Sequence, residues 1–476
     1  MSNMALEPTY ENLINHYLND TIGRNDDLFY FVRILSGLNS GSAVALNAAW
    51  GSGKTFFVKQ VKILIDIHNL DSDIHTVCLN QEEIASIKDV YNKHNSGTEK
   101  YDMPKMATVY YDAWKYDDTE DPLLSLLYCI MNRFGKSVPN DKVDVIKKFA
   151  KQSISILSSA ARYITGINVQ EILETIKNYA DACEDTVKEQ KSDESLEKRI
   201  NSFLNDVVLD DEEKLIIFID ELDRCNPQYA VKLLERVKHY FNHPKVVFVI
   251  SYNKSELQHS IKTLYGSEFS ADKYLERFFD YEFGLSTIDS GSYLDSLGCS
   301  NTVHINMKAV AKIYGFQMRE LCKYYDCVNN ATAMIKKLIS KNIYSPEKSL
   351  EFCIIWFLPV IIGLRFYNEN YYREFIEGKG FKHYEAFYDL RIRNKEHHFG
   401  QLISSIEQID ETYNGIMQNR VDPVSMENKF RQLYTAIFKD IDKDKQVLIG
   451  NIMIDSAVKR DFLKIYNGIS YLADYK

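Results

Sequence analysis

The stretch from Val44 to Val58, VALNAAWGSGKTFFV, constrains the fold of this chain more than any other part of the sequence. Val44 to Leu46 predict a buried strand, Trp50 to Gly53 a turn, and the residues from Lys54 onward a helix. The two glycines of the turn let successive N–H groups converge on an anion, and the following helix points the positive end of its dipole at the same place. This order of elements predicts a loop that binds phosphate.

The residues of this loop have specific expected roles. Lys54 is expected to reach the β- and γ-phosphates of a nucleotide, and the hydroxyl of Thr55 to ligate Mg²⁺. The usual spelling is G-x-x-x-x-G-K-[ST], whereas this chain has Ala48 at the first position, and alanine tolerates positive φ poorly. An ordinary β-turn-α connection remains the alternative interpretation. The residues expected to contact nucleotide are Ala49, Trp50, Gly51, Ser52, Gly53, Lys54, Thr55 and Phe56.

A second stretch, LIIFIDELDR at Leu215–Arg224, carries the acidic groups that such a loop needs. Its apolar run predicts a central parallel strand buried on both faces, and the strand ends in two adjacent acids where ligands of open α/β sheets bind. Asp220 is the expected Mg²⁺ ligand through the hydration shell. Glu221 is the candidate base that orients the attacking water, because its side chain is longer and leans to the other side of the strand. A merely solvated pair of acids is the alternative.

A third strand is predicted at Lys245–Ser251, again apolar in its middle. The polar residue Asn253 follows it and could hydrogen-bond the attacking water or the γ-phosphate. The same side chain could cap a helix that starts at Ser255, and the two roles are compatible. Further strands are predicted at 108–111 and 281–285, so the fold class is α/β, with a parallel sheet covered by helices.

Length predicts more than one domain, because 476 residues exceed the ~250–300 at which a single core stops growing. Helices are expected in residues 1–40, and the nucleotide domain in 41–290 with a helical insertion at about 135–213. Apolar residues recur at helical spacing through 291–476, which predicts an all-helical C-terminal domain. The polar stretch 86–102 is predicted to be irregular.

Composition argues against several classes of protein. A net charge of −10 does not indicate binding to nucleic acid through the overall field. The eight cysteines are scattered without a C-x-x-C, and no basic-then-apolar leader opens the sequence, so a reduced, cytoplasmic protein is expected. The apolar run Phe352–Leu364 contains Pro359 and falls short of the ~20 residues that span a bilayer, which favours a buried helix pair over membrane attachment.

Five sequence features, in one order between Val44 and Leu285, resemble the KAP family of P-loop NTPases. They are AAWGSGKT, YYDAWKYDD, IIFIDELDRCNP with the following LLERVKHYF, VVFVISYNKSEL, and KYLERFFDYEFGL. The resemblance implies an additional-strand P-loop fold of the AAA+/STAND kind, ATP or GTP as ligand, and a switch that couples nucleotide state to a partner. Bacterial relatives include phage-exclusion proteins, so a role in anti-phage defence is implied by analogy.

The chain departs from the family pattern, which usually has glycine at Ala48, a second aspartate at Glu221 and an aspartate at Asn253. The glutamate strengthens the expectation of hydrolysis, because it resembles the acid pair of active AAA+ enzymes. A cation near the transferred phosphoryl group can be worth ~10³–10⁵ in rate. Three arginines are candidates for this cation, and a salt bridge is the alternative for each. They are Arg224, Arg277 and Arg319.

The sequence thus favours a Mg²⁺-dependent nucleoside triphosphatase, with ATP favoured over GTP. Its helical domain is expected to convert nucleotide state into binding of an unidentified protein partner or into self-assembly. A kinase that uses the same phosphate loop is an alternative function, although no residues in the sequence indicate the lid that a kinase needs. A scaffold that binds nucleotide with little hydrolysis is a second rival, and a membrane-surface protein anchored by 352–364 is a third.

Overall fold

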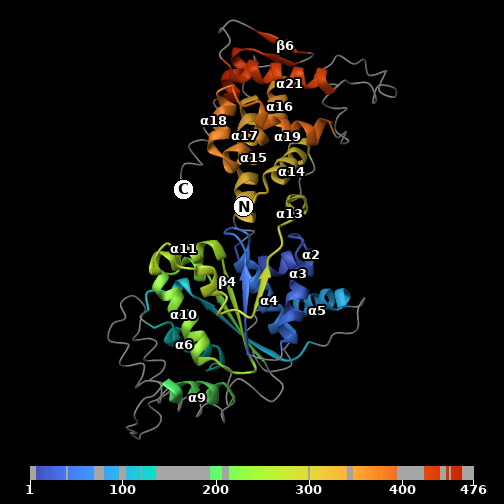
Figure 1. Ribbon diagram of the computed structural model, residues 1–476. Coiled ribbons are helices and arrows are strands. Elements are labelled where there is room, and N and C mark those ends of the chain that lie inside the picture. Colours follow the sequence, from blue (N-terminus) through green and yellow to red (C-terminus); the bar gives the residue numbers. More distant parts are fainter. Residues whose placement is uncertain are drawn as a thin grey trace. The chain divides into compact units, whose positions relative to one another are not determined.

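The computed structural model describes residues 7–38, 41–68, 80–95, 103–119, 121–135, 193–205, 214–297, 301–339, 347–393, 423–439, 446–449 and 452–463. The chain divides into two compact units (Figure 1). The first holds Leu6–Asp20 and Arg24–Thr287, and the second is built mainly from Ile288–Lys476. The chain passes from the first unit to the second after Thr287. The sequence predicts a domain boundary at about 290.

The first unit contains a five-stranded sheet in the order β2-β3-β4-β1-β5, and every neighbouring pair is parallel. The strands are β1 (Ser42–Asn47), β2 (Met106–Asp112), β3 (Lys214–Asp220), β4 (Val246–Tyr252) and β5 (Tyr281–Gly284). One strand, β4, separates the strand that precedes the glycine loop from the strand that ends in the acid pair. This additional-strand order confirms the predicted fold class.

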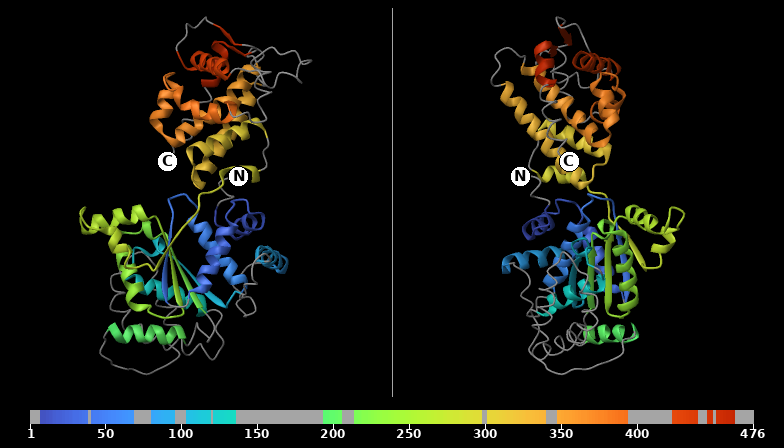
Figure 2. Two further views of the ribbon diagram at one scale, coloured as in Figure 1. Left: turned by 45° about the vertical axis from the view of Figure 1, so that its right-hand side comes forward. Right: turned by 90° about the vertical axis from the view of Figure 1, so that its left-hand side faces the viewer.

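The sequence of the central strands explains their place in the sheet. All seven residues of β4 are buried, as are six of the seven in β3, because a parallel sheet is covered by helices on both faces. Helices α6 and α10 share a core with β3 and β4 on one face, and α4 covers the other (Figure 2). The helices of this unit are α2 (Tyr10–Asn19), α3 (Asn25–Gly37), α4 (Lys54–His68), α5 (Gln81–Asn95), α6 (Pro122–Gly135), α9 (Asp193–Phe203), α10 (Pro227–Tyr240), α11 (Lys254–Tyr265) and α12 (Ala271–Leu275).

Helix α5 corrects the prediction of irregular structure at 86–102 over the part that the structure describes. Its N-terminus is a reciprocal cap, in which the Glu83 N–H donates to Asn80 Oδ1 at 2.8 Å and the Asn80 N–H donates to Glu83 Oε2 at 3.0 Å. Ile87 and Tyr91, four residues apart, are buried on one face of the helix. The predicted insertion at about 135–213 lies mostly outside the described residues, and α9 belongs to its end.

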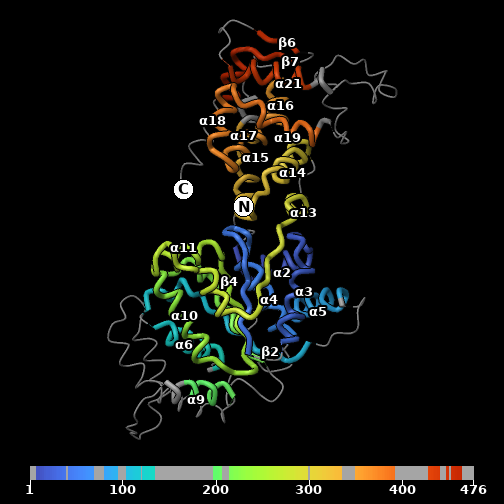
Figure 3. Tube along the Cα trace, viewed as in Figure 1, coloured from blue at the N-terminus to red at the C-terminus, as the bar shows by residue number. Residues whose placement is uncertain are grey.

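The second unit is helical, with a small exception that corrects the all-helical prediction. A two-stranded antiparallel sheet, β6 (Val447–Ile449) and β7 (Ile452–Ile454), packs beside α21 (Figure 3). Its strands have three residues each, which is too short for an alternating pattern to stand out in the sequence. The helices are α13 (Ser290–Ser296), α14 (Thr302–Tyr314), α15 (Met318–Ile339), α16 (Glu347–Trp356), α17 (Leu358–Tyr367), α18 (Glu369–Ile376), α19 (Lys382–Tyr388) and α21 (Pro423–Phe438).

The apolar run at 352–364 forms parts of α16 and α17, which confirms the predicted helix pair. The helices separate at Phe357, and Pro359 lies in the first turn of α17, where its missing N–H costs nothing. Within the described residues, one segment, Ser349–Tyr367, is long and apolar enough to cross a membrane, and 78% of it is buried inside the protein. Such burial is typical of a core helix, because a helix that spans a bilayer presents apolar side chains to lipid.

Candidate functional site

The predicted phosphate loop connects β1 to α4, as the sequence indicates. Gly51 has φ 78° and Gly53 has φ 89°, which are backbone conformations that L side chains rarely adopt. Among the described residues other than glycine, positive φ occurs at Asp20 and Glu221. Ala48 therefore sits in a conformation that alanine accepts, and its departure from the motif strains nothing in the loop.

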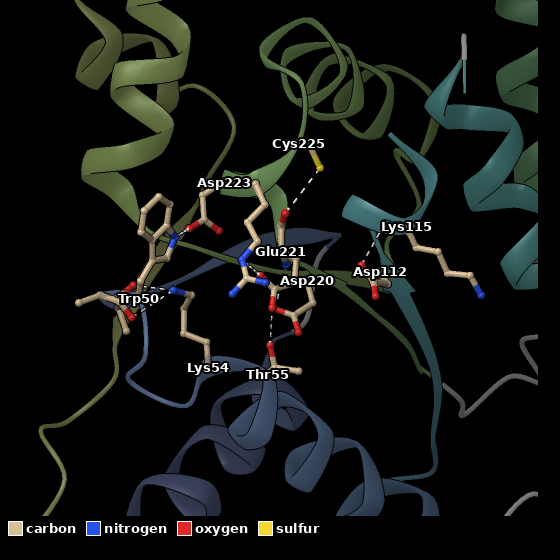
Figure 4. Close-up of polar contacts among 12 residues, drawn as sticks. Trp50, Lys54, Thr55, Asp112, Lys115, Asp220, Glu221, Asp223 and Cys225 are labelled. Atoms are coloured by element: carbon tan, nitrogen blue, oxygen red, sulfur yellow. Dashed lines mark hydrogen bonds and ion pairs between the residues drawn. The ribbon is translucent and has the colours of Figure 1, made fainter. Parts of the chain in front are cut away.

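Lys54 begins α4, and its side chain folds back over the loop (Figure 4). Its Nζ donates to the carbonyl of Ala48 at 2.8 Å and to that of Ala49 at 3.3 Å. Burial lowers the pKa of the ammonium group, and the negative charge of Asp223 is the largest opposing influence. The lysine is thus a desolvated cation at the mouth of the loop, which is the arrangement that attracts a polyanion.

Asp220 ends β3 with its carboxylate fully buried and hydrogen-bonded. One oxygen accepts the Glu221 N–H at 3.0 Å, and the other accepts the hydroxyl of Tyr110, on the neighbouring strand β2, at 2.9 Å. Burial and the charge of Asp220 raise the pKa of Tyr110, so this phenol stays a donor. Tyr110 was not predicted as a site residue. The additional-strand order could have indicated it, because that order places β2 beside β3.

Glu221 joins the two motifs. Its Oε1 accepts the hydroxyl hydrogen of Thr55 at 3.1 Å across 166 positions of sequence (Figure 4). Its Oε2 pairs with Arg224 Nε at 2.7 Å. Its backbone is left-handed at φ 61°, a strained conformation for a residue with a side chain. Burial and then Asp220 raise the pKa of its carboxyl group, while Arg224 opposes them.

Two exposed tryptophans flank these acids. The indole N–H of Trp50 donates to the carboxylate of Asp223, so the loop is tied to the turn that follows β3. The guanidinium of Arg224 lies 5.4 Å from the ring centroid of Trp114 and is held by that ring as well as by Glu221. Asp223 was not predicted as a site residue, because its role depends on how the turn folds.

Other predicted site residues lie in different surroundings. Asn253 caps α11, with its Oδ1 accepting from the N–H and the hydroxyl of Ser255 at 3.2 and 2.7 Å. Arg277 is exposed after α12, where its carbonyl accepts from Lys238, and Arg319 is exposed on α15 in the second unit. Phe56 is buried against the ring of His16. The roles predicted for these residues toward a nucleotide stay predictions.

The donors and acceptors present fit a magnesium nucleotide. Among the buried polar atoms without a hydrogen-bond partner in the described protein are Ser52 Oγ in the loop, Asp223 Oδ1 in the turn after β3 and Ser251 Oγ on β4. Such orphaned groups are costly unless a ligand or water satisfies them. Within the described part of the chain, no cluster of three metal-binding side chains exists. Thr55 and Asp220 suit Mg²⁺, which takes few protein ligands and completes its shell with phosphate and water.

The sheet order, the glycine loop that leads into Lys54 and the acid pair on β3 define a P-loop NTPase of the additional-strand class. A model of the KAP family P-loop domain matches residues 30–341, about two thirds of the sequence. The chain belongs to this family.

Two individual proteins are also similar to the chain. An uncharacterised protein of Methanocaldococcus jannaschii is 26% identical over 171 residues, which cover 30% of this chain and 88% of that protein. A solved structure of the ORC2 protein of Aeropyrum pernix, in ADPNP and ADP complexes, is 12% identical with a TM-score of 0.29. That alignment covers 88% of this chain and 95% of the other. A TM-score this low does not establish a common fold, so the classification rests on the family match.

Proposed function

We propose that this chain is a Mg²⁺-dependent nucleoside triphosphatase that acts as a nucleotide-driven switch, coupling hydrolysis to partner binding or self-assembly. ATP is the favoured nucleotide and GTP the alternative. A cytoplasmic role in bacterial anti-phage defence follows from the family resemblance alone. These statements go beyond the family membership, which supports nucleotide binding by a P-loop domain.

One observation carries the proposal. The hydroxyl of Thr55, in the first turn of α4, donates to the carboxylate of Glu221, directly after β3, at 3.1 Å. The contact brings the expected metal ligand and the expected base within one hydrogen bond, although 166 positions separate them in sequence. Buried Asp220 and Lys54 belong to the same cluster, since both acids act on the pKa of the lysine.

Each side chain then has a definable task. Lys54 binds the terminal phosphates, and the loop N–H groups orient them. Thr55 and Asp220 would hold magnesium, which when bound supplies positive charge against the phosphate oxygens. Glu221 accepts the proton of the attacking water. Its raised pKa makes it a better general base than an ordinary surface carboxylate. Tyr110 fixes the orientation of the Asp220 carboxylate.

A nucleotide-gated scaffold is the second candidate, and one contact favours it. Both oxygens of Glu221 are engaged, one by Thr55 and the other by Arg224 at 2.7 Å. A base that is held by an arginine is less available to water. In this alternative the protein binds ATP, changes its state and hydrolyses it very slowly.

The substitution E221Q separates the two candidates, because it keeps the size of the side chain and removes the proton acceptor. We expect wild-type protein to release phosphate from magnesium ATP and E221Q to lose at least ~100-fold in single-turnover rate while still binding ATP. The exposed acid Glu82 on α5 gives the matched control E82Q. Equal and negligible turnover in wild type and E221Q favours the scaffold. Failure of wild type to bind ATP or GTP would refute both.

A further inference from the structure

Arg24 is a buried cation that the proposed chemistry does not use. The residue is 5% exposed, and it immediately precedes α3. Its Nη1 donates to the carbonyl of Ser52 at 2.7 Å, and its Nη2 donates to the carbonyl of Ser286. One side chain therefore joins the phosphate loop to a residue 262 positions from Arg24 in the sequence.

The contact with Ser52 bears on the loop itself. In a trans peptide the carbonyl of one residue and the N–H of the next point in opposite directions. The guanidinium that holds the Ser52 carbonyl therefore also sets the direction of the Gly53 N–H, on the side of the peptide away from Arg24. Gly53 has φ 89°, a conformation open to glycine but not fixed by backbone preference, so the contact of Arg24 with the Ser52 carbonyl helps to hold the orientation of this peptide.

The contact with Ser286 bears on the end of the first unit. Ser286 follows β5, whose register continues through the Leu285 N–H to the Asn47 carbonyl at 3.2 Å, and the first unit ends at Thr287. The Ser286 hydroxyl also donates to the carboxylate of Asp27, in the first turn of α3. Arg24 and Asp27 thus hold the same residue through its main chain and its side chain.

The backbone at Arg24 is held in place by hydrogen bonds of its own. The Asp20 carboxylate, at the C-terminus of α2, accepts the N–H of Arg24 at 3.0 Å and that of Asn25 at 3.1 Å. Burial lowers the pKa of the guanidinium to about 10, with the charge of Asp27 opposing this. A desolvated cation that binds carbonyl oxygens is costly to keep, and the protein would fill this place more cheaply with an apolar side chain if it only needed packing.

We infer that Arg24 is a positioning residue that couples the nucleotide state of the phosphate loop to the segment Leu285–Thr287, through which the chain leaves the first unit. The inference rests on the proposed function, and names the residue through which the switch begins. When the loop closes on phosphate, the Ser52 carbonyl and the Arg24 guanidinium move together. The segment Leu285–Thr287, which we call the exit segment, moves with them.

Hydrogen exchange of the full-length protein tests the coupling. Amides of residues 48–56 report on the loop and those of 280–290 on the exit, with and without saturating magnesium ADP. In wild type both segments are expected to exchange more slowly with ADP. In R24Q the affinity for ADP is expected to fall about ten- to a hundredfold, because charge-assisted hydrogen bonds are lost, and at saturation only the loop is expected to respond.

Two further variants sharpen the result. R24K keeps the positive charge but has a single nitrogen that cannot span both carbonyls, so it is expected to lose the exit response as R24Q does. R133Q is the matched control, because Arg133 is a partly buried arginine of the same unit whose Nε donates to the Thr108 carbonyl at 3.2 Å. It is expected to keep both responses.

The outcomes are distinguishable from failure of the proposed function. If the wild-type loop does not respond to ADP at all, nucleotide binding itself is refuted. If the loop responds and the exit does not, or if R24Q or R24K keeps the exit response, the coupling is overturned. Should R24Q not fold, R24K, which keeps the buried charge, carries the test: an exit response in R24K equal to that of wild type would overturn the coupling.

Discussion

The two units of this protein bury different kinds of side chain. In the first unit charged and polar groups lie buried around the site, among them Lys54, Asp220, Asp223 and Arg24. In the second unit the core is aromatic, and the ring of Phe430 alone contacts the rings of Phe352, Trp356, Phe357, Tyr384 and Tyr388. The second unit buries polar groups as well, such as Arg391, whose Nε donates to Asn306 Oδ1 at 2.8 Å, so the contrast lies in the cluster of buried charges at the candidate site of the first unit against the aromatic cluster of the second.

The comparison predicts that substitutions in the second unit should act on stability far more than on hydrolysis, and that those at the site should do the reverse. The largest expected effect concerns Phe430, which is fully buried in the aromatic core. F430A should lower the free energy of unfolding by about 3–5 kcal/mol, measured by urea denaturation, because it leaves a large cavity. The control L448A, at a residue 69% exposed on β6, should leave stability unchanged. A loss of hydrolysis per folded molecule in F430A would contradict the division.

At the site, K54A should reduce single-turnover hydrolysis by about 10²–10³-fold, as expected when one preorganised charge is removed from a transferring phosphoryl group. Its melting temperature without nucleotide should be unchanged or higher, because the pKa of Lys54 is lowered by burial and the charge is costly. The exposed Lys262 on α11 gives the control K262A. A large loss of stability in K54A would show that the first unit also depends on this ion for its fold.

Two helical glycines, one in each unit, differ in the space around them. A Cβ on Gly363 of α17 would lie 2.3 Å from Val310 Cγ1 on α14, whereas a Cβ on Gly37 at the end of α3 would meet nothing within 4 Å. G363A should therefore destabilise the protein by about 1–3 kcal/mol through overpacking. G37A should be neutral or slightly stabilising, because alanine favours a helix. Thermal denaturation of both variants checks the pair, and equal effects would refute the packing argument.

Y110F should weaken magnesium-dependent nucleotide binding about tenfold, because Asp220 loses the hydroxyl donor that orients its carboxylate. Titration calorimetry with and without magnesium measures the effect. The neighbouring Tyr111 is the wrong control, since its hydroxyl is buried against Tyr229, so the exposed tyrosine in Y281F is the better comparison. Equal affinities in Y110F and wild type would remove Tyr110 from the site.

The smallest expected effect is a pH dependence in the second unit. Burial lowers the pKa of His304 below its usual 6.5, so the folded state disfavours its protonated form. Its stabilising contribution is complete above pH 6.5 and is lost as the pH falls from 6.5 through the lowered pKa. The fluorescence of Trp356, in a W50F/W114F background, follows melting of this unit between about pH 7.5 and 5. H304N should flatten the dependence, and parallel curves for both proteins would count against it.

The sequence predicted those parts of the fold whose signals are local. The strand, glycine loop and helix around Lys54 lie in one short stretch, and the apolar runs of β3 and β4 are the mark of strands covered on both faces. The strand order came from the family resemblance, because an apolar run does not say which strand lies beside it. Helix α5 was not predicted, because the stretch is rich in charged residues and its apolar face is narrow. Its capping box was not recognised either.

The residues that meet at the candidate site were predictable where they belong to a motif, and not where their contacts depend on the fold. Lys54, Thr55, Asp220 and Glu221 are named by their motifs. The contact of Tyr110 depends on the pairing of β2 with β3, which only the strand order implied by the family resemblance could have indicated. The contacts of Arg24 depend on the path of a distant segment, which no motif marks. The ion pair of Arg224 with Glu221 agrees with the salt bridge that the sequence left open for this arginine.

The left-handed backbone at Glu221 has a consequence for how this protein can change. Glycine or asparagine would relax that turn, so the residues that suit the backbone best are ones without a carboxylate to accept a proton. Under the proposed role of Glu221 as the base, a laboratory selection for heat resistance alone would therefore favour residues at this position that abolish hydrolysis. A selection that also requires turnover would retain Glu221. The residue found at this position would then show which selection had been applied.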